Sequence, residues 1–258
     1  MIDRPVRAKN QKMMKGRPIT GEEFDKMIAA VPKVVAQKIP KENTDQINRV
    51  VESWQHYLKG LWWSGLRLTE SLELYWDRDQ KLKPIMAGKK SLIIIPGNLE
   101  KGNESRACPM APEFFEFLDE TPEVERRGPV FRPLGDEGGR VGTYFAGHVI
   151  SDIGKVAGVI VDHYPDNKPK KYASAHDLRR SFGERWARHL MPAKLRELMR
   201  HTSIDTTMRY YVGHNAEDTA CVLWAVKDRT DQSNPQNHLH DTKNPTPTDR
   251  RNPLPRNK

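Results

Sequence analysis

Cysteine is scarce in this 258-residue chain, which contains only Cys108 and Cys221. The two lie far apart and form no Cys-x-x-Cys pair, which argues against a disulfide framework or a thiolate zinc site and fits a reducing compartment. The sequence also lacks an apolar run long enough to span a membrane and the apolar core of a signal peptide. We therefore expect a soluble, cytoplasmic protein with no membrane partner.

Clustered carboxylates, which metal-dependent nucleases use to neutralise phosphates, do not stand out in the sequence either. The His-x-His pair at His238 and His240 has no accompanying ligands. We therefore expect neither a metal nor a cofactor. What the sequence does have is positive charge: 43 Lys and Arg against 34 Asp and Glu give a formal net charge of +9. Such a balance favours a polyanionic partner, although a solvated basic surface has the same composition.

The apolar spacing predicts a mainly helical chain with one region of extended structure. Thr20 followed by Glu23 predicts a capping box at the start of a first helix. A second helix is expected from about residue 44, and its Trp54 should be a core residue rather than a platform for bases, as should Trp62 and Trp63. The β-rich runs 92–96 and 106–109 indicate strands on either side of a turn-rich connection.

Another short helix is expected over residues 111–119, with Phe114, Phe115 and Leu118 facing the core. After it comes a Gly-, Arg- and Asp-rich segment, 126–140, that is typical of a loop. The basic segment 164–171 is placed well for phosphate contacts, and a solvated loop is the equal alternative.

The residues with the clearest chemistry lie between residues 175 and 212. His176 and Arg179 are three positions apart in a helical pattern, so both side chains can reach one target. Further on come His201 and the adjacent Tyr210 and Tyr211. Arginine offers a planar fork of donors matched to phosphate oxygens, and tyrosine can form covalent intermediates. These residue types suit a phosphate that is attacked by a side-chain nucleophile.

The segments HDLRRSF and LMRHTSIDTTMRYY resemble the C-terminal motifs of the tyrosine recombinases, the phage integrase family. The family pattern is His-x-x-Arg, then a Gly-His pair, then the nucleophilic tyrosine nine residues after that histidine. This spacing selects Tyr210 rather than Tyr211. One departure is Arg200, which stands before His201 where the family usually has glycine and adds a charge at a helix end.

Two earlier segments resemble further family motifs. Gly65, Arg67 and Glu70 match Gly-x-Arg-x-x-Glu, in which the glutamate supports the arginine; a surface ion pair between Arg67 and Glu70 is the alternative. Lys101 occupies the hairpin connection in which the family carries a catalytic lysine. Lys89 and Lys90, in the preceding turn, compete with it for that role.

The resemblance implies an α+β fold, mainly α-helical with a small antiparallel sheet, like the tyrosine recombinase catalytic domain. We expect a basic linker or arm over residues 1–17, the catalytic domain over 18–227 and a disordered polar tail over 228–258. The family usually has a smaller DNA-clamping domain in front, for which 1–17 leave no room. We interpret the sequence as a catalytic-domain fragment or a stripped-down member.

The resemblance also implies a function, a site and partners. The activity would be site-specific breakage and rejoining of DNA strands through a 3′-phosphotyrosyl intermediate. The partners would be double-stranded DNA, other copies of the chain in a tetramer on DNA, and accessory DNA-bending or directionality proteins, in the nucleoid of a bacterium or phage host. A type IB topoisomerase-like relaxase and a catalytically silent DNA-binding module are the alternatives. The implied catalytic residues are Arg67, Lys101, His176, Arg179, His201 and Tyr210.

Overall fold

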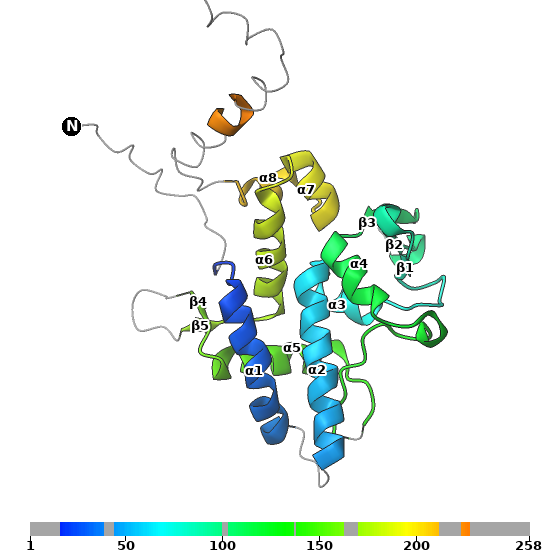
Figure 1. Ribbon diagram of the computed structural model, residues 1–258, viewed down its shortest axis with the longest axis vertical. Coiled ribbons are helices and arrows are strands. Elements are labelled where there is room, and N and C mark those ends of the chain that lie inside the picture. Colours follow the sequence, from blue (N-terminus) through cyan, green and yellow to red (C-terminus); the bar gives the residue numbers. More distant parts are fainter. Residues whose placement is uncertain are drawn as a thin grey trace, which may run out of the picture. The chain divides into compact units, whose positions relative to one another are not determined.

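The computed structural model describes residues 16–38, 44–99, 103–136, 138–162, 170–211 and 223–227 (Figure 1). The chain divides into two compact units, residues 1–212 and 213–258, and residues 223–227 of the second unit are helical. The predicted arm 1–17 lies outside the described residues except for Gly16 and Arg17, and the predicted tail 228–258 lies wholly outside them.

Helices dominate the first unit, with a three-stranded and a two-stranded sheet beside them. The α-helices are α1 (Gly21–Lys38), α2 (Thr44–Ser64), α3 (Leu68–Leu72), α4 (Pro112–Asp119), α5 (Thr143–Val156), α6 (Ala175–Ala187), α7 (Pro192–Met199) and α8 (Ile204–Met208). The strands are β1 (Lys83–Ile85), β2 (Leu92–Ile95), β3 (Arg106–Pro109), β4 (Ile160–Asp162) and β5 (Lys171–Tyr172), and single 3-10 turns cover Gly88–Lys90, Gly97–Leu99 and Glu123–Glu125. This is the predicted fold class, mainly helical with a small antiparallel sheet.

The first helix starts as its sequence predicts. The backbone N–H of Thr20 donates to Glu23 Oε2 at 3.0 Å, and the N–H of Glu23 donates to Thr20 Oγ1 at 3.2 Å, which completes the capping box. Its apolar stripe then packs on α2, where Phe24 stacks on Trp62 with ring centroids 4.5 Å apart. This pair fixes α1 against the end of α2 that leads into the candidate site.

The tryptophans of α2 are core residues, as expected. Trp54 is fully buried and Trp62 nearly so, while Trp63 is half-buried against the same core. The indole N–H of Trp54 donates to the carbonyl of Leu134 at 3.0 Å, so its polar atom is satisfied away from water. Close packing here also needs Gly60, because a Cβ at that position would lie 2.1 Å from the ring of Phe131.

The three-stranded sheet has the order β1-β2-β3, and both pairs are antiparallel. Ile94 pairs with Lys83 on one side, and Ile93 pairs with Cys108 on the other. The second and third strands match the two predicted runs, whereas β1 was not predicted as a separate strand. Lys101, in the connection between β2 and β3, lies outside the described residues.

Helix α4 confirms one prediction and corrects another. It covers the predicted segment, but Phe114, Phe117 and Leu118 are its buried residues, and Phe115 is only half-buried. The buried positions follow the i, i+3, i+4 spacing of one helix face, whereas a residue at i+1 points about 100° away from that face. The prediction that Phe115 faces the core was therefore wrong, because position 115 lies off the buried face of the helix.

Figure 1 shows α6 beside α2, with α5 crossing α1. The short helices α7 and α8 follow α6, and α7 packs on both α6 and α8. This arrangement brings the turn between α2 and α3, the start of α6 and the α7–α8 segment together. No described helix is long and apolar enough to cross a membrane.

Candidate active site

The turn between α2 and α3 is built around a glycine. Gly65 has a φ of 57°, in the left-handed region that glycine enters without cost. A Cβ there would also lie 2.2 Å from Phe182 Cδ1 in α6, so the position excludes side chains on two grounds. The chain then leaves the left-handed conformation, and Arg67 becomes the N-cap residue of α3. Arg67 thus sits in a turn held by two helices.

The start of α6 is fixed by a buried carboxylate. Ser174 donates to Asp177 Oδ2 through its backbone N–H at 3.0 Å and through its hydroxyl at 2.7 Å. Asp177 is fully buried and also pairs with Arg180 and, at 3.4 Å, with the ammonium group of Lys171. These contacts hold the first two turns of the helix, which carry His176 and Arg179.

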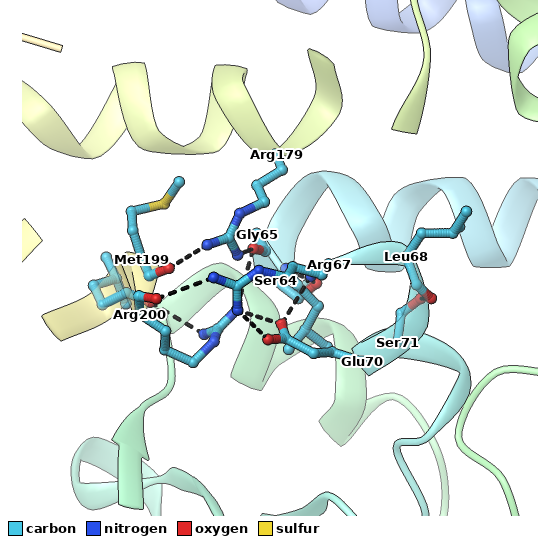
Figure 2. Close-up of polar contacts among 11 residues, drawn as sticks. Ser64, Gly65, Arg67, Leu68, Glu70, Ser71, Arg179, Met199 and Arg200 are labelled. Carbon is cyan, nitrogen blue, oxygen red and sulfur yellow. Dashed lines mark hydrogen bonds and ion pairs between the residues drawn. The ribbon is translucent and has the colours of Figure 1, made fainter. Parts of the chain in front are cut away.

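Arg179 connects three elements from within the core. Its side chain is buried, and its two terminal nitrogens donate to the carbonyls of Gly65 and Met199 (Figure 2). Burial, with the neighbouring charge of Arg200 as the next contribution, lowers the pKa of Arg179 to about 9. The guanidinium therefore stays charged at neutral pH, and it ties α6 to the α2–α3 turn and to the end of α7.

Arg67 lies close by, but its side chain is 46% exposed. Its Nη1 atom is 2.5 Å from Glu70 Oε1, and its Nη2 atom donates to the carbonyl of Arg200 at 3.1 Å. The backbone N–H of Arg67 also donates to Glu70 Oε2 at 2.8 Å. The ion pair that the sequence suggested does exist, and it is built into the turn rather than lying free on the surface.

Arg200 ends α7 in the left-handed conformation, with φ 53° and ψ 42°. For residues other than glycine this conformation costs roughly 1–2 kcal/mol, which explains why glycine suits the position. The side chain is nonetheless buried, and its Nη2 atom lies 3.0 Å from Glu70 Oε2 (Figure 2). Burial opposes ionisation of Glu70, but the charge of Arg200 and the bond from Arg67 hold its pKa at about 2.

His201 and Tyr210 face each other across the α7–α8 segment. Their rings stack with centroids 5.8 Å apart and an angle of 16° between planes. The Nδ1 atom of His201 lies 3.0 Å from the hydroxyl oxygen of the buried Thr207. Burial, followed by the charges of Arg179 and Arg67, lowers the pKa of His201 to about 4, so the imidazole is neutral at pH 7.

The two adjacent tyrosines have different surroundings. Tyr210 is buried, and its ring lies on the backbone of α6, because a Cβ at Gly183 would be 2.6 Å from Tyr210 Cε1. Tyr211 is half-buried, and its hydroxyl donates to the carbonyl of Leu190 at 2.5 Å. Burial raises the pKa of both phenols. The Tyr211 hydrogen bond thus links the turn after α8 to the α6–α7 connection, whereas Tyr210 faces the other candidate residues.

A pocket of about 370 Å³ opens where these elements meet. It brings together four of the six predicted site residues. Arg67 is not among its lining residues; it is linked to Arg200, the neighbour of the lining residue His201, through the Arg200 carbonyl and through Glu70. Lys101 lies outside the described residues. The pocket is lined by Lys171, His176, Arg179, Arg180, His201, Thr206, Arg209 and Tyr210.

Sequence reasoning did not single out three cations of this pocket: Lys171, Arg180 and Arg209. Lys171 ends the basic segment 164–171, so its composition was a usable signal. Arg180 follows Arg179 directly, and its pairing with Asp177 gives it a structural role as well. Within the described ranges, no group of three or more His, Cys, Asp or Glu side chains is arranged to hold a metal ion. Four of the lining residues, Lys171, Arg179, Arg180 and Arg209, are cationic and none is a carboxylate, so the pocket is suited to an anion.

The two histidines predict how stability depends on pH. Burial is the main reason that the pKa values of His176 and His201 are lowered in the folded state. The unfolded chain, with an ordinary histidine pKa near 6.5, binds more protons below that pH, so stability falls as the pH drops from about 6.5 toward the folded value. The free energy of unfolding, measured with urea, should fall more between pH 7 and pH 5 for the unchanged protein than for His201→Gln. Equal losses would contradict the depressed pKa.

Comparisons with known proteins indicate the family to which this chain belongs. The model of the phage integrase family matches residues 19–217. Solved structures with a similar fold include a Tn1549 transposon integrase in complex with transposon right end DNA, at 15% identity and a TM-score of 0.51. That alignment covers 84% of this chain and 68% of the other.

A lambda integrase dimer bound to a COC′ core site is similar at 14% identity and a TM-score of 0.50, over 80% of this chain and 63% of the other. A XerA recombinase is 18% identical, with a TM-score of 0.46, over 88% and 68%. The alignments thus cover roughly two thirds of each of these solved chains. No curated protein matches the sequence.

The sequence identities to the solved structures are low, so these similarities show a shared fold and nothing more. The family match, in contrast, spans most of the chain and includes every element that builds the pocket. The chain therefore belongs to the phage integrase family, the tyrosine recombinases.

Proposed function

We propose that this protein is a site-specific DNA recombinase that breaks and rejoins DNA strands through a covalent link between Tyr210 and a 3′-phosphate. One observation carries the proposal: Tyr210 shares a single pocket with Arg179, His176 and His201. A phenol next to a fixed guanidinium and two imidazoles has the groups that phosphodiester exchange requires. Membership of the family supports the same activity.

The pocket can hold a phosphate and balance its charge. Arg179 lines the pocket and Arg67 lies outside its lining; both carry planar guanidinium groups, the kind of group that can donate two parallel hydrogen bonds to phosphate oxygens. His201 is neutral, and in the tautomer in which Nδ1 accepts from the Thr207 hydroxyl, Nε2 carries the proton and can donate to the phosphate. Donors fixed before the reaction stabilise the charge of the transition state most effectively.

Tyr210 must lose its proton as it attacks. An ordinary tyrosine has a pKa near 10, so on the order of one phenol in a thousand is ionised at pH 7. Burial raises the pKa of Tyr210 further, so the ionised fraction is smaller still. His176, whose pKa burial lowers, is neutral at pH 7 and can accept the proton. Attack and proton transfer therefore belong to one step.

In that step the phenol oxygen of Tyr210 forms a bond to phosphorus, and the bond from phosphorus to the 5′-oxygen breaks. The leaving 5′-oxygen takes a proton, for which Lys101 in the β2–β3 connection is the proposed donor. A 5′-hydroxyl from another strand then attacks the phosphotyrosine and releases the phenol. One phosphoester replaces another, so the exchange is nearly isoenergetic and consumes no nucleotide.

The proposed partner is double-stranded DNA. The net charge of +9 and the basic pocket support it, as do the solved relatives that were captured on transposon and core-site DNA. We also propose that the chain assembles as a tetramer on DNA, with accessory DNA-bending or directionality proteins, in the nucleoid of a bacterium or a phage host. A topoisomerase-like relaxase would use the same covalent step but rejoin the original strand.

The proposal is tested by capturing the covalent intermediate. The protein is mixed with a pool of nicked duplexes of randomised sequence, in which the short fragment behind the cleaved phosphate diffuses away and prevents rejoining. Denaturing conditions then separate DNA that is covalently bound to protein from free DNA, and peptide mapping locates the modified residue. We expect an adduct on Tyr210, with the recovered sequences converging on one motif.

The outcomes separate the possible functions. An adduct on Tyr210, with exchange between two duplexes that carry the recovered motif, supports recombination. Adduct formation without exchange, together with relaxation of a supercoiled plasmid, would instead indicate the topoisomerase-like activity. DNA binding with no adduct from any sequence would contradict the proposal and favour a silent binding module.

A further inference from the structure

Figure 2 shows Arg200 among polar contacts with Glu70 and the α2–α3 turn. The residue is 4% exposed, and its Nη1 atom donates to the carbonyl of Leu198 at 3.1 Å. Its Nη2 atom donates to the carbonyl of Gly65 at 3.3 Å and to Glu70 Oε2 at 3.0 Å. One side chain thus links the end of α7 to the α2–α3 turn, although its backbone adopts a conformation that favours glycine.

Glu70 is shared between two guanidinium groups. One carboxylate oxygen accepts from Arg67 Nη1, and the other accepts from the Arg67 backbone and from Arg200. A carboxylate paired with Arg67 alone would compete with phosphate for that guanidinium, because both anions use the same donors. With Arg200 present, Glu70 keeps a buried cation as partner when the Arg67 side chain turns to a phosphate.

The same residue also supports Arg179. Gly65 offers its carbonyl to both Arg179 and Arg200, and the carbonyl of Met199, next to Arg200 in the chain, accepts from Arg179. The backbone carbonyl of Arg200 accepts from Arg67. Arg200 is thus in contact with the surroundings of both phosphate-binding arginines, without being among the residues that line the pocket.

We propose that Arg200 is a positioning residue that neutralises Glu70 and thereby leaves the Arg67 guanidinium available to the scissile phosphate. This inference rests on the proposed function, since it assigns Arg200 a part in the same phosphate site. Its chemistry is electrostatic: three guanidinium groups and one carboxylate surround the α2–α3 turn, so the cluster stays positive when Glu70 is paired. Arg200 acts through Glu70 and touches no reacting atom.

The test is a pair of substitutions that should correct each other. Arg200→Gly suits the left-handed backbone but leaves Glu70 with Arg67 as its cation, so cleavage at saturating DNA should slow about 10- to 100-fold. Glu70→Gln alone should also slow cleavage, because it leaves the buried Arg200 unpaired. Combined with Arg200→Gly, however, Glu70→Gln should raise the rate above that of Arg200→Gly, since it weakens the hold on Arg67.

The measurements are the single-turnover rate of adduct formation and the Kd, both on the duplex recovered by covalent capture, with thermal unfolding as the check on folding. The Kd should change by less than about threefold, because many other contacts bind the DNA backbone. Arg200→Lys keeps the charge and should retain more activity than Arg200→Gly. Arg185→Met serves as the matched control: it removes a partly buried guanidinium of α6 that donates to the Trp62 carbonyl, away from the pocket.

The possible results separate a positioning role of Arg200 from a loss of stability and from failure of the proposed function. Unchanged cleavage by Arg200→Gly, or a double variant slower than Arg200→Gly, would overturn the positioning role. If Arg185→Met slows cleavage as much as Arg200→Gly does, the effect comes from reduced stability alone. If the unchanged protein forms no adduct, the proposed function itself fails, and that outcome is visible before any variant is compared.

Discussion

Tyr210→Phe is expected to bind DNA as tightly as the unchanged protein and to form no covalent adduct with it. The substitution keeps the ring that lies on Gly183 and stacks on His201, so the pocket retains its shape. Only the oxygen that would attack phosphorus is removed, and no other side chain can supply it from the same position. Incubation with the nicked duplex, followed by denaturing electrophoresis, measures the adduct directly.

The matched control is the neighbouring Tyr211→Phe. Both tyrosines lie in the turn that follows α8, where the Tyr210 ring lies on Gly183 and Tyr211 turns to the α6–α7 connection, so the two phenols do not face one phosphate. The Tyr211 hydroxyl donates to Leu190, and its loss should destabilise the segment by about 1 kcal/mol while adducts still form, if more slowly. An adduct on Tyr211, or one formed by Tyr210→Phe, would show that the assignment of the nucleophile is wrong.

The second large effect is expected from the two arginines that would bind the phosphate. Arg67→Lys and Arg179→Lys keep a positive charge but lose the planar fork of donors. By analogy with the loss of one oxyanion donor, each should slow cleavage by about 10²–10³-fold at saturating DNA. Binding should persist in both variants, because other basic residues contact the DNA backbone.

The two variants differ in what else they disturb. Arg179 is buried and satisfies the carbonyls of Gly65 and Met199, so its replacement should also lower the free energy of unfolding. Arg67 is half-exposed, so Arg67→Lys should change stability far less. Single-turnover rates, read beside thermal unfolding of each variant, separate chemistry from folding. Cleavage within a few-fold of normal by either variant would remove that arginine from the site.

Local features of the molecule could be predicted from the sequence because they depend on spacing along one element. The capping box of Thr20 and Glu23 and the helical face shared by His176 and Arg179 are set within four residues. The choice of Tyr210 as nucleophile rests on the family spacing of nine residues after His201, and it stays a prediction. Such patterns survive because tertiary packing acts on them without changing their period.

Features that depend on residues far apart in the chain could not be found in this way. Arg200 and Glu70 meet across 130 positions, and nothing near either residue indicates that pairing. Arg200 was noticed as a departure from the family pattern, yet its burial followed only from the packing of α7 on the α2–α3 turn. Lys171 belonged to a segment whose charge could equally have been solvated. Whether such a charged side chain is buried or solvated depends on how the whole core packs.

The contact between the Tyr210 ring and the bare backbone of Gly183 has a consequence for how this protein can change over time. Because main-chain atoms form the support, changes among the surrounding side chains can alter the outer pocket while the Tyr210 ring keeps its place. The freedom has one exception: at position 183 even a methyl group would collide with the tyrosine ring, so this small residue constrains the lineage more than many larger ones.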